Sequence, residues 1–234
     1  MTDNYNKMYK YMVDLGLPIP LDKGQMSELF FDVQLIRRGK DHPGLPAANY
    51  TFKTYYIDSM EQFERYYPEI KKCCEIFGLR AYISVNAKEK TEAARKTLER
   101  YAHDIVTNDY RKPWKDFSSV CGGLDGKEKR WIIDVDDCDD IDTYLNKIYE
   151  AIQMCESGFD NPIVTTIHTR TGFHIITHPF NMKRFKDICD ALSITPPDIK
   201  KNHITLLYEN LEVFKINQDY EKLCEEQYKD KFGE

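Results

Sequence analysis

The sequence lacks any stretch of about 18 apolar residues, the minimum that a membrane-spanning helix needs. Its first residues also lack the basic start and the apolar segment that define a secretory signal peptide. We therefore expect a soluble protein of the cytoplasm that makes no contact with a membrane.

The chain has seven cysteines, and no two of them form a C-x-x-C pair. An odd number of scattered cysteines argues against a disulfide framework, and the missing pairs argue against a zinc ribbon. We expect reduced cysteines in the core and no zinc.

An excess of positive charge is also absent, since 33 Lys and Arg residues face 39 Asp and Glu residues, a net charge of −6. This excludes a uniformly basic protein that coats nucleic acid, because neutralising phosphates requires a positive surface. A local basic groove stays compatible with this charge. Disorder is excluded by aromatic content, because 16 Tyr, 12 Phe and 2 Trp among 234 residues indicate a sizeable core.

Hydrophobic periodicity and turn residues predict alternating strands and helices, which indicates an α/β (α+β) protein with mixed sheets. Asn181 and the capping box that begins at Ser59 predict two of the helix starts. In the helix over 90–107, we expect Ala94, Leu98, Tyr101 and Ile105 to form the buried face. The expected strands are 30–37, 51–57, 79–85, 130–136, 163–168, 173–178 and 203–208, and the expected helices are 3–15, 59–77, 90–107, 140–154 and 181–192.

We divide the chain into an N-terminal helical segment (1–24), one domain (25–215) and an acidic helical tail (216–234). No linker interrupts the domain, so its two subunits, about 25–110 and 111–215, are expected to pack as one body.

Asp134 and Asp136 carry the clearest chemical signal. They lie two residues apart on an apolar strand, so both carboxylates project from the same face, while Ile133 and Val135 point into the core. Two neighbouring negative charges require a cation or water, and hard oxygen ligands suit Mg²⁺ or Mn²⁺. The alternative interpretation is a solvated acidic strand end that leads into a helix.

A second signal is the segment Thr169–His174, which opens another apolar strand. Gly172 permits a close backbone approach, and the hydroxyl of Thr171 with Arg170 and His174 would suit the phosphates of a nucleotide. The alternative is that His174 is a structural histidine with satisfied hydrogen bonds.

The order of these motifs resembles the archaeo-eukaryotic primase (primase-polymerase) superfamily. Trp131–Asp136 is similar to its acidic-pair strand, and Thr171–His174 is similar to its motif of a small residue two positions before a histidine. The family often has Ser where this chain has Gly172, and its larger members carry a zinc element that this chain lacks.

The resemblance implies a core of two packed α/β units, the second of RNA-recognition (RRM-like) type, with the site in the cleft between them. It implies a DNA-directed nucleotidyltransferase that adds nucleotides on a single-stranded template with Mg²⁺ or Mn²⁺. Asp134, Asp136 and a third acid, either Asp198 or the less favoured Glu209, would hold two metal ions.

The nucleotide would be bound by Thr171, Gly172, His174 and Arg170. Nucleoside triphosphates, single-stranded nucleic acid and a helicase or other replication protein are the implied partners, in a viral or plasmid replication system.

Basic residues outside these motifs have two interpretations each. In the first interpretation, the template strand is contacted by Arg37, Arg38 and Lys40 and by the clusters at 183–186 and 200–201. In the second, all of these residues are ordinary solvated surface. Arg80 lies on an apolar strand, so its guanidinium either reaches the nucleotide or pairs with a structural carboxylate.

Three other functions are compatible with the carboxylates. The first is a primase-like fold that binds nucleotide or nucleic acid without catalysis, as a replication accessory protein. The second is a phosphohydrolase of the haloacid-dehalogenase kind, although its D-x-D usually lies near the start of the domain. The third is a metal-dependent nuclease.

Overall fold

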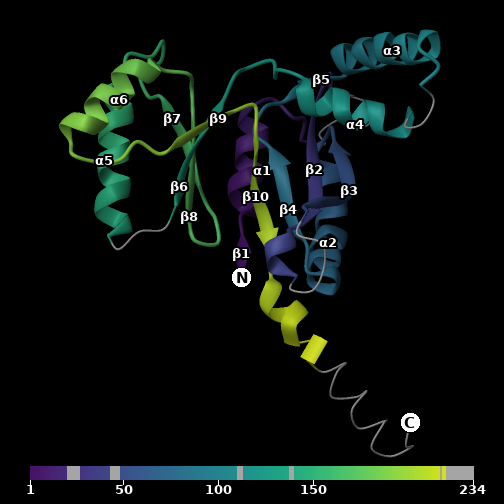
Figure 1. Ribbon diagram of the computed structural model, residues 1–234, viewed down its shortest axis with the longest axis horizontal. Helices are drawn as coiled ribbons and strands as arrows, with labels where there is room; N and C mark the ends of the chain where they lie inside the picture. The colour runs from purple at the N-terminus through teal and green to yellow at the C-terminus, as the bar shows by residue number, and fades with distance from the viewer. Residues whose placement is uncertain (20–26, 43–47, 110–112, 137–139, 217, 220–234) are drawn as a thin grey trace, which may run out of the picture.

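The computed structural model describes residues 1–19, 27–42, 48–109, 113–136, 140–216 and 218–219. Its strands form a six-stranded sheet and a four-stranded sheet that lie side by side (Figure 1). The mixture of helices and strands confirms the α/β (α+β) class. All pairs among the described strands are antiparallel, so the expectation of mixed sheets is wrong. The large sheet has the order β1 (Thr2–Asp3), β10 (Ile204–Glu209), β4 (Arg80–Ser84), β2 (Leu29–Arg37), β3 (Tyr50–Ile57), and β5 (Lys88–Glu89) also pairs with β2.

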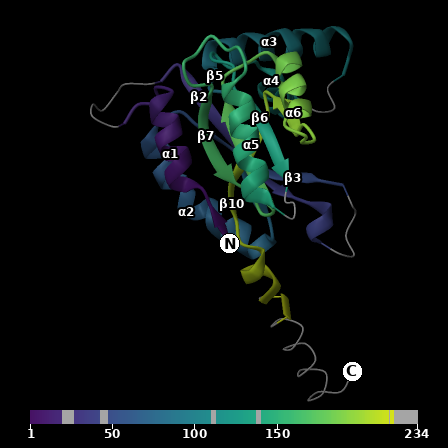
Figure 2. The ribbon, with the colours of Figure 1, turned by 90° about the vertical axis from the view of Figure 1, so that its left-hand side faces the viewer.

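Two helices, α1 (Tyr5–Asp14) and α2 (Met60–Phe77), cover one face of the large sheet (Figure 2). The sequence predicted both ends of α2. The hydroxyl of Ser59 accepts a hydrogen bond from the backbone N–H of Gln62, and Gly78 ends the helix with φ of 59°. The apolar residues of α2 that face the sheet, including Phe63 and Ile70, are fully buried.

The small sheet is built from one β-α-β-β-α-β unit. It runs through β6 (Trp131–Asp136), α5 (Ile141–Gln153), β7 (Ile163–His168), β8 (Gly172–Thr177), α6 (Met182–Ala191) and β9 (Asp198–Lys201). The strand order is β7-β8-β6-β9, which is the ferredoxin-like arrangement and agrees with the RRM-like unit that was expected. The two helices pack on one face of this sheet, against Ile133 and Val135 of β6.

The opposite face of the small sheet contacts the large unit. Ile132, Ile167 and Ile176 belong to the same buried cluster as Leu207 of β10 and Tyr11 of α1. Because side chains alternate along a strand, Asp134 and Asp136 share this inner face with Ile132. The fold therefore turns the acidic pair toward the junction of the two sheets.

One buried asparagine connects both ends of the small unit to the large one. The side-chain oxygen of Asn86 accepts a 2.7 Å hydrogen bond from the backbone N–H of Arg130, just before β6. Its amide nitrogen donates at 3.3 Å to Asn202, just after β9. The chain then returns to the large sheet as β10, so the expected boundary, which placed 111–215 together, does not follow the sheets.

Two further helices, α3 (Lys90–Val106) and α4 (Pro113–Gly123), pack against each other. The expected buried face of α3 is wrong. Ala93 and Thr97 are buried, while Leu98 and Ile105 are 68% and 60% exposed. The physical reason is that α3 packs mainly on α4 and meets the sheet only near Phe30, so a narrow stripe of small residues forms its contact.

The helix α4 and the strands β1, β5 and β9 are not among the elements expected from the sequence. Residues 220–234 of the expected acidic tail lie outside the described residues.

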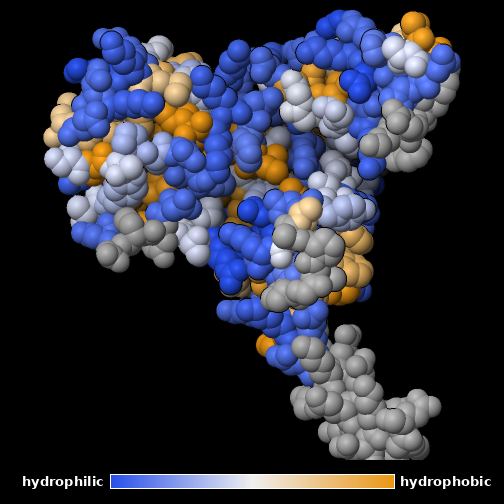
Figure 3. Space-filling view, in the orientation of Figure 1, coloured by the Kyte–Doolittle hydropathy of each residue, from blue (hydrophilic) through white to orange (hydrophobic). Residues whose placement is uncertain are grey.

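Within the described part of the chain, no helix is long and apolar enough to cross a membrane. Figure 3 shows that hydrophilic residues cover most of the surface in this view.

Candidate functional site

Three of the predicted site residues lie in one row across the small sheet. In the strand register, Asp134 of β6 is directly opposite His174 of β8 on one side and directly opposite Asp198 of β9 on the other. Asp136, the next residue of β6 on the same face, lies opposite Gly172 of β8. Directly opposite residues in an antiparallel pair have Cβ atoms about 4.5–5.5 Å apart, so the row is a compact group.

Two cationic or hydrogen-donating groups contact Asp134. Its Oδ1 lies 3.1 Å from Nε2 of His174, and its Oδ2 contacts Nζ of Lys200. The hydrogen bond from His174 and then the contact with Lys200 lower the pKa of Asp134 well below its usual range, against the opposing effect of burial. Asp134 is therefore an ionised carboxylate with both oxygens engaged.

His174 is fixed between the two sheets. Its ring is buried, with Nε2 toward Asp134 and Nδ1 at 2.9 Å from the hydroxyl of Thr205 on β10. In the neutral ring, Nε2–H donates to Asp134 and Nδ1 accepts from Thr205. The large sheet thus orients a histidine that belongs to the small sheet.

Gly172 is explained by backbone packing. A Cβ atom at this position would lie 2.0 Å from the carbonyl oxygen of Val135 on the neighbouring strand. The close approach in the structure is therefore to β6, and it allows β8 to bring His174 into register with Asp134.

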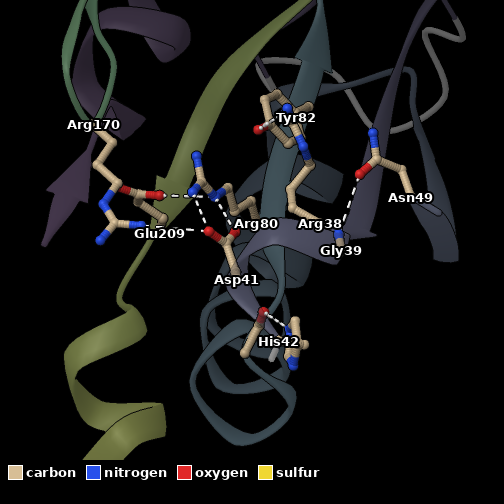
Figure 4. Close-up of polar contacts among 10 residues, drawn as sticks. Arg38, Gly39, Asp41, His42, Asn49, Arg80, Tyr82, Arg170 and Glu209 are labelled. Atoms are coloured by element: carbon tan, nitrogen blue, oxygen red, sulfur yellow. Dashed lines mark hydrogen bonds and ion pairs between the residues drawn. The ribbon is translucent and has the colours of Figure 1, made fainter. Parts of the chain in front are cut away.

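The predicted residues Arg80, Arg170 and Glu209 form a second group around Asp41 (Figure 4). The guanidinium of Arg80 donates to both oxygens of Asp41 at 2.8 and 2.7 Å, and its Nε lies 3.2 Å from Glu209. All three of these side chains are at most 7% exposed. Of the two interpretations of Arg80, the structure shows the pairing with structural carboxylates.

Glu209 is the less favoured candidate for the third acid, and its side chain pairs with Arg80 and not with the row. Asp198, the favoured candidate, lies in the row and is exposed. Of the two candidates, Asp198 is the one that lies beside Asp134.

The turn between β7 and β8 presents Arg170 and Thr171 to the solvent. Arg170 is 46% exposed and lies 3.4 Å from Asp41, and Thr171 is also exposed. Both positions are available to an incoming anion, and the turn is only a few residues from His174.

The predicted template-binding residues lie at the end of β2 and in a short 3₁₀ turn, η1 (Gly39–Asp41). Arg38 donates a 2.9 Å hydrogen bond to the hydroxyl of Tyr82. Lys40 is exposed, and Arg37 is partly buried. These residues are adjacent in sequence to Asp41, so they border the second group and not the row.

A polar groove of about 700 Å³ lies over β2 and β3. Its lining includes Gln34, Thr54, Lys115 and Asp32, a carboxylate that forms a buried ion pair with Lys88. The groove lies on the large sheet, and none of the row residues lines it.

The row presents carboxylate oxygens of the kind that bind a divalent cation. Within the described residues, no three side chains of His, Cys, Asp or Glu converge on one point in the manner of a metal site. Mg²⁺, however, is usually held by one or two carboxylates, and substrate phosphates and water complete its shell. Asp136 and Asp198, with Asp134 once Lys200 leaves it, offer this donor set on the inner face of the small sheet, so the residues fit an ion that binds together with a phosphate.

Two residues that shape the site, Thr205 and Asp41, were not predicted from the sequence. The contact of Lys200 with Asp134 was not predicted either. The pair Lys200–Lys201 was interpreted as a basic cluster, but the two side chains diverge. Lys200 contacts Asp134, while Lys201 lies over the ring of Trp131 at 4.8 Å. Alternation along a strand would have separated the two lysines, had 198–201 been identified as a strand.

Comparison of the chain with family models, curated proteins and solved structures gave no match.

Proposed function

We propose that this protein is a nucleotidyltransferase of the primase-polymerase type, which adds nucleotides to a strand on a nucleic-acid template. The observation that supports this most is the row His174–Asp134–Asp198, because it unites both sequence motifs with the third acid on one face of an RRM-like sheet. Viral or plasmid replication would be the setting.

The carboxylates provide the metal-binding part of this function. Asp134, Asp198 and Asp136 are the residues that would hold Mg²⁺ or Mn²⁺ against the triphosphate. Such ions, when bound, neutralise the phosphates and activate the attacking hydroxyl.

The remaining side chains position the nucleotide. His174, whose two ring nitrogens contact Asp134 and Thr205, would border the nucleotide and hold the carboxylate of Asp134 in a fixed place. Arg170 and Thr171, exposed at the adjacent turn, can bind the outer phosphates. Arg37, Arg38 and Lys40 would contact the template backbone.

One observation favours a second candidate, a protein that binds nucleotides or nucleic acid without catalysis. Lys200 already neutralises Asp134, so this carboxylate is electrostatically satisfied without any metal ion. A replication accessory protein would need no more than this.

The test is incorporation of labelled nucleotides on single-stranded and primed templates, with Mg²⁺ or Mn²⁺, by the full chain. We expect Asp134→Asn to reduce incorporation by at least about 100-fold. Asp142→Asn, at an exposed position in the first turn of α5, should retain full activity.

Three results would contradict the proposal. Full incorporation by the Asp134 variant would show that the row is not the site. Crosslinking of labelled triphosphate without incorporation would support the binding protein. Release of phosphate from small esters, or cleavage of the template, would support a phosphohydrolase or a nuclease.

A further inference from the structure

The contact between Lys200 and Asp134 is specific to one of two adjacent lysines. Lys200 and Asp198 are two residues apart on β9, so their side chains share the inner face of the small sheet. Lys201 is on the other face, where its ammonium lies over the ring of Trp131. The sheet therefore directs one lysine, and not its neighbour, at the carboxylate.

The ammonium group of Lys200 occupies an oxygen of Asp134 that a metal ion would otherwise bind. The two oxygens of Asp134 are taken by His174 and Lys200, which leaves no free oxygen on this carboxylate for a cation. Asp136 and Asp198, in contrast, have no ion pair within the described residues. A metal ion that uses Asp134 must displace one of the two partners.

Lys200 is the partner that can leave. Its side chain is 33% exposed on a flexible stem, whereas the ring of His174 is buried and held on its other side by Thr205. Movement of Lys200 into solvent breaks one contact, the one with Asp134, while movement of His174 would break two.

We propose that Lys200 is an internal counter-ion that competes with divalent metal for Asp134. Metal alone binds weakly, because it must first displace the ammonium group. This inference rests on the proposed function, since it assumes that Asp134 is a metal ligand.

The experiment is a titration of the full chain with MnCl₂ in the absence of nucleotide, with free Mn²⁺ measured by electron paramagnetic resonance. Removal of the charge in Lys200→Met should tighten Mn²⁺ binding by about tenfold or more, since a competing unit charge is lost next to the carboxylate. Lys200→Arg, which keeps the charge, should bind as weakly as the wild type. Lys201→Met is the matched control and should also leave the affinity unchanged.

The double variant Asp134→Asn with Lys200→Met should lose the Mn²⁺ affinity that Lys200→Met alone gains. This result would assign the gain in affinity to the carboxylate of Asp134. Thermal unfolding of each variant checks that the fold is kept. Equal Mn²⁺ affinity of the wild type and Lys200→Met would overturn the inference, and it would do so without affecting the proposed function if the wild type still incorporates nucleotides. Absence of both Mn²⁺ binding and incorporation in every variant would overturn the inference and the proposed function together.

Discussion

Thr205 of the large sheet holds His174 of the small sheet through a 2.9 Å hydrogen bond between its hydroxyl and Nδ1 of the ring. Both side chains are buried, and 31 residues separate them in sequence. The contact matters because the opposite nitrogen of the same ring lies against Asp134. The orientation of the site thus depends on packing between two sheets.

Substitution of Thr205 by Val removes the hydroxyl at nearly constant volume and leaves Nδ1 of His174 without its partner. We expect a loss of about 1–3 kcal/mol in the free energy of unfolding, together with weaker nucleotide binding. Thr205→Ser should restore both. Denaturant titration and nucleotide-binding measurements check the two effects.

Thr177→Val is the matched control for this prediction. Thr177 is equally buried on β8, but its hydroxyl has no hydrogen-bond partner among the described residues. Its replacement should be neutral or stabilising. Equal destabilisation by the two variants would argue against a specific role of the Thr205 hydroxyl.

Substitution of Gly172 by Ala places a methyl group 2.0 Å from the carbonyl oxygen of Val135. The strands β6 and β8 must separate to accept it, so we expect destabilisation of about 1–3 kcal/mol or more and reduced activity from displacement of the row. Gly158→Ala is the control, because its added carbon meets nothing within 4 Å. A melting temperature of Gly172→Ala equal to that of the wild type would contradict the packing argument.

Substitution of Arg80 by Met leaves the buried carboxylates of Asp41 and Glu209 without their shared cation. Breaking a buried pair in this way costs about 3–5 kcal/mol, whereas loss of an exposed pair costs about 0–1 kcal/mol. Lys53→Met, which removes the exposed pair with Glu69, is therefore the control. Urea unfolding of both variants measures the difference, and similar small losses would show that the group around Asp41 contributes little.

The lowered pKa of Asp134 predicts a defined dependence of stability on pH. Because the folded pKa lies below the unfolded value of about 3.9, the ionised carboxylate stabilises the fold fully above about pH 4 and progressively less below it. The difference in melting temperature between the wild type and Asp134→Asn should shrink as the pH falls from 6 to below 4. A difference that stays constant over this range would contradict the assignment of the charge to this side chain.

Much of the fold follows from local signals. The alternation in Trp131–Asp136 predicts β6 and its two faces, and Ser59 and Gly78 predict both ends of α2, because these features depend on neighbours within a few residues. The same holds for Asn181, whose side chain accepts hydrogen bonds from two backbone N–H groups at the start of α6.

The elements that were missed depend on distant partners. Strand β9 has only four residues, follows two prolines and is polar at three positions, so its extended form depends on pairing with β6. The partners of Arg80 and His174, Asp41 and Thr205, lie 39 and 31 residues away, and no local pattern marks them. The residues of the row could be predicted from the sequence, but the side chains that contact them could not.

Asn86 joins the beginning and the end of the small unit at a single buried point. Because this one side chain anchors both crossings of the chain, we expect its loss to free the small unit at both of its ends together.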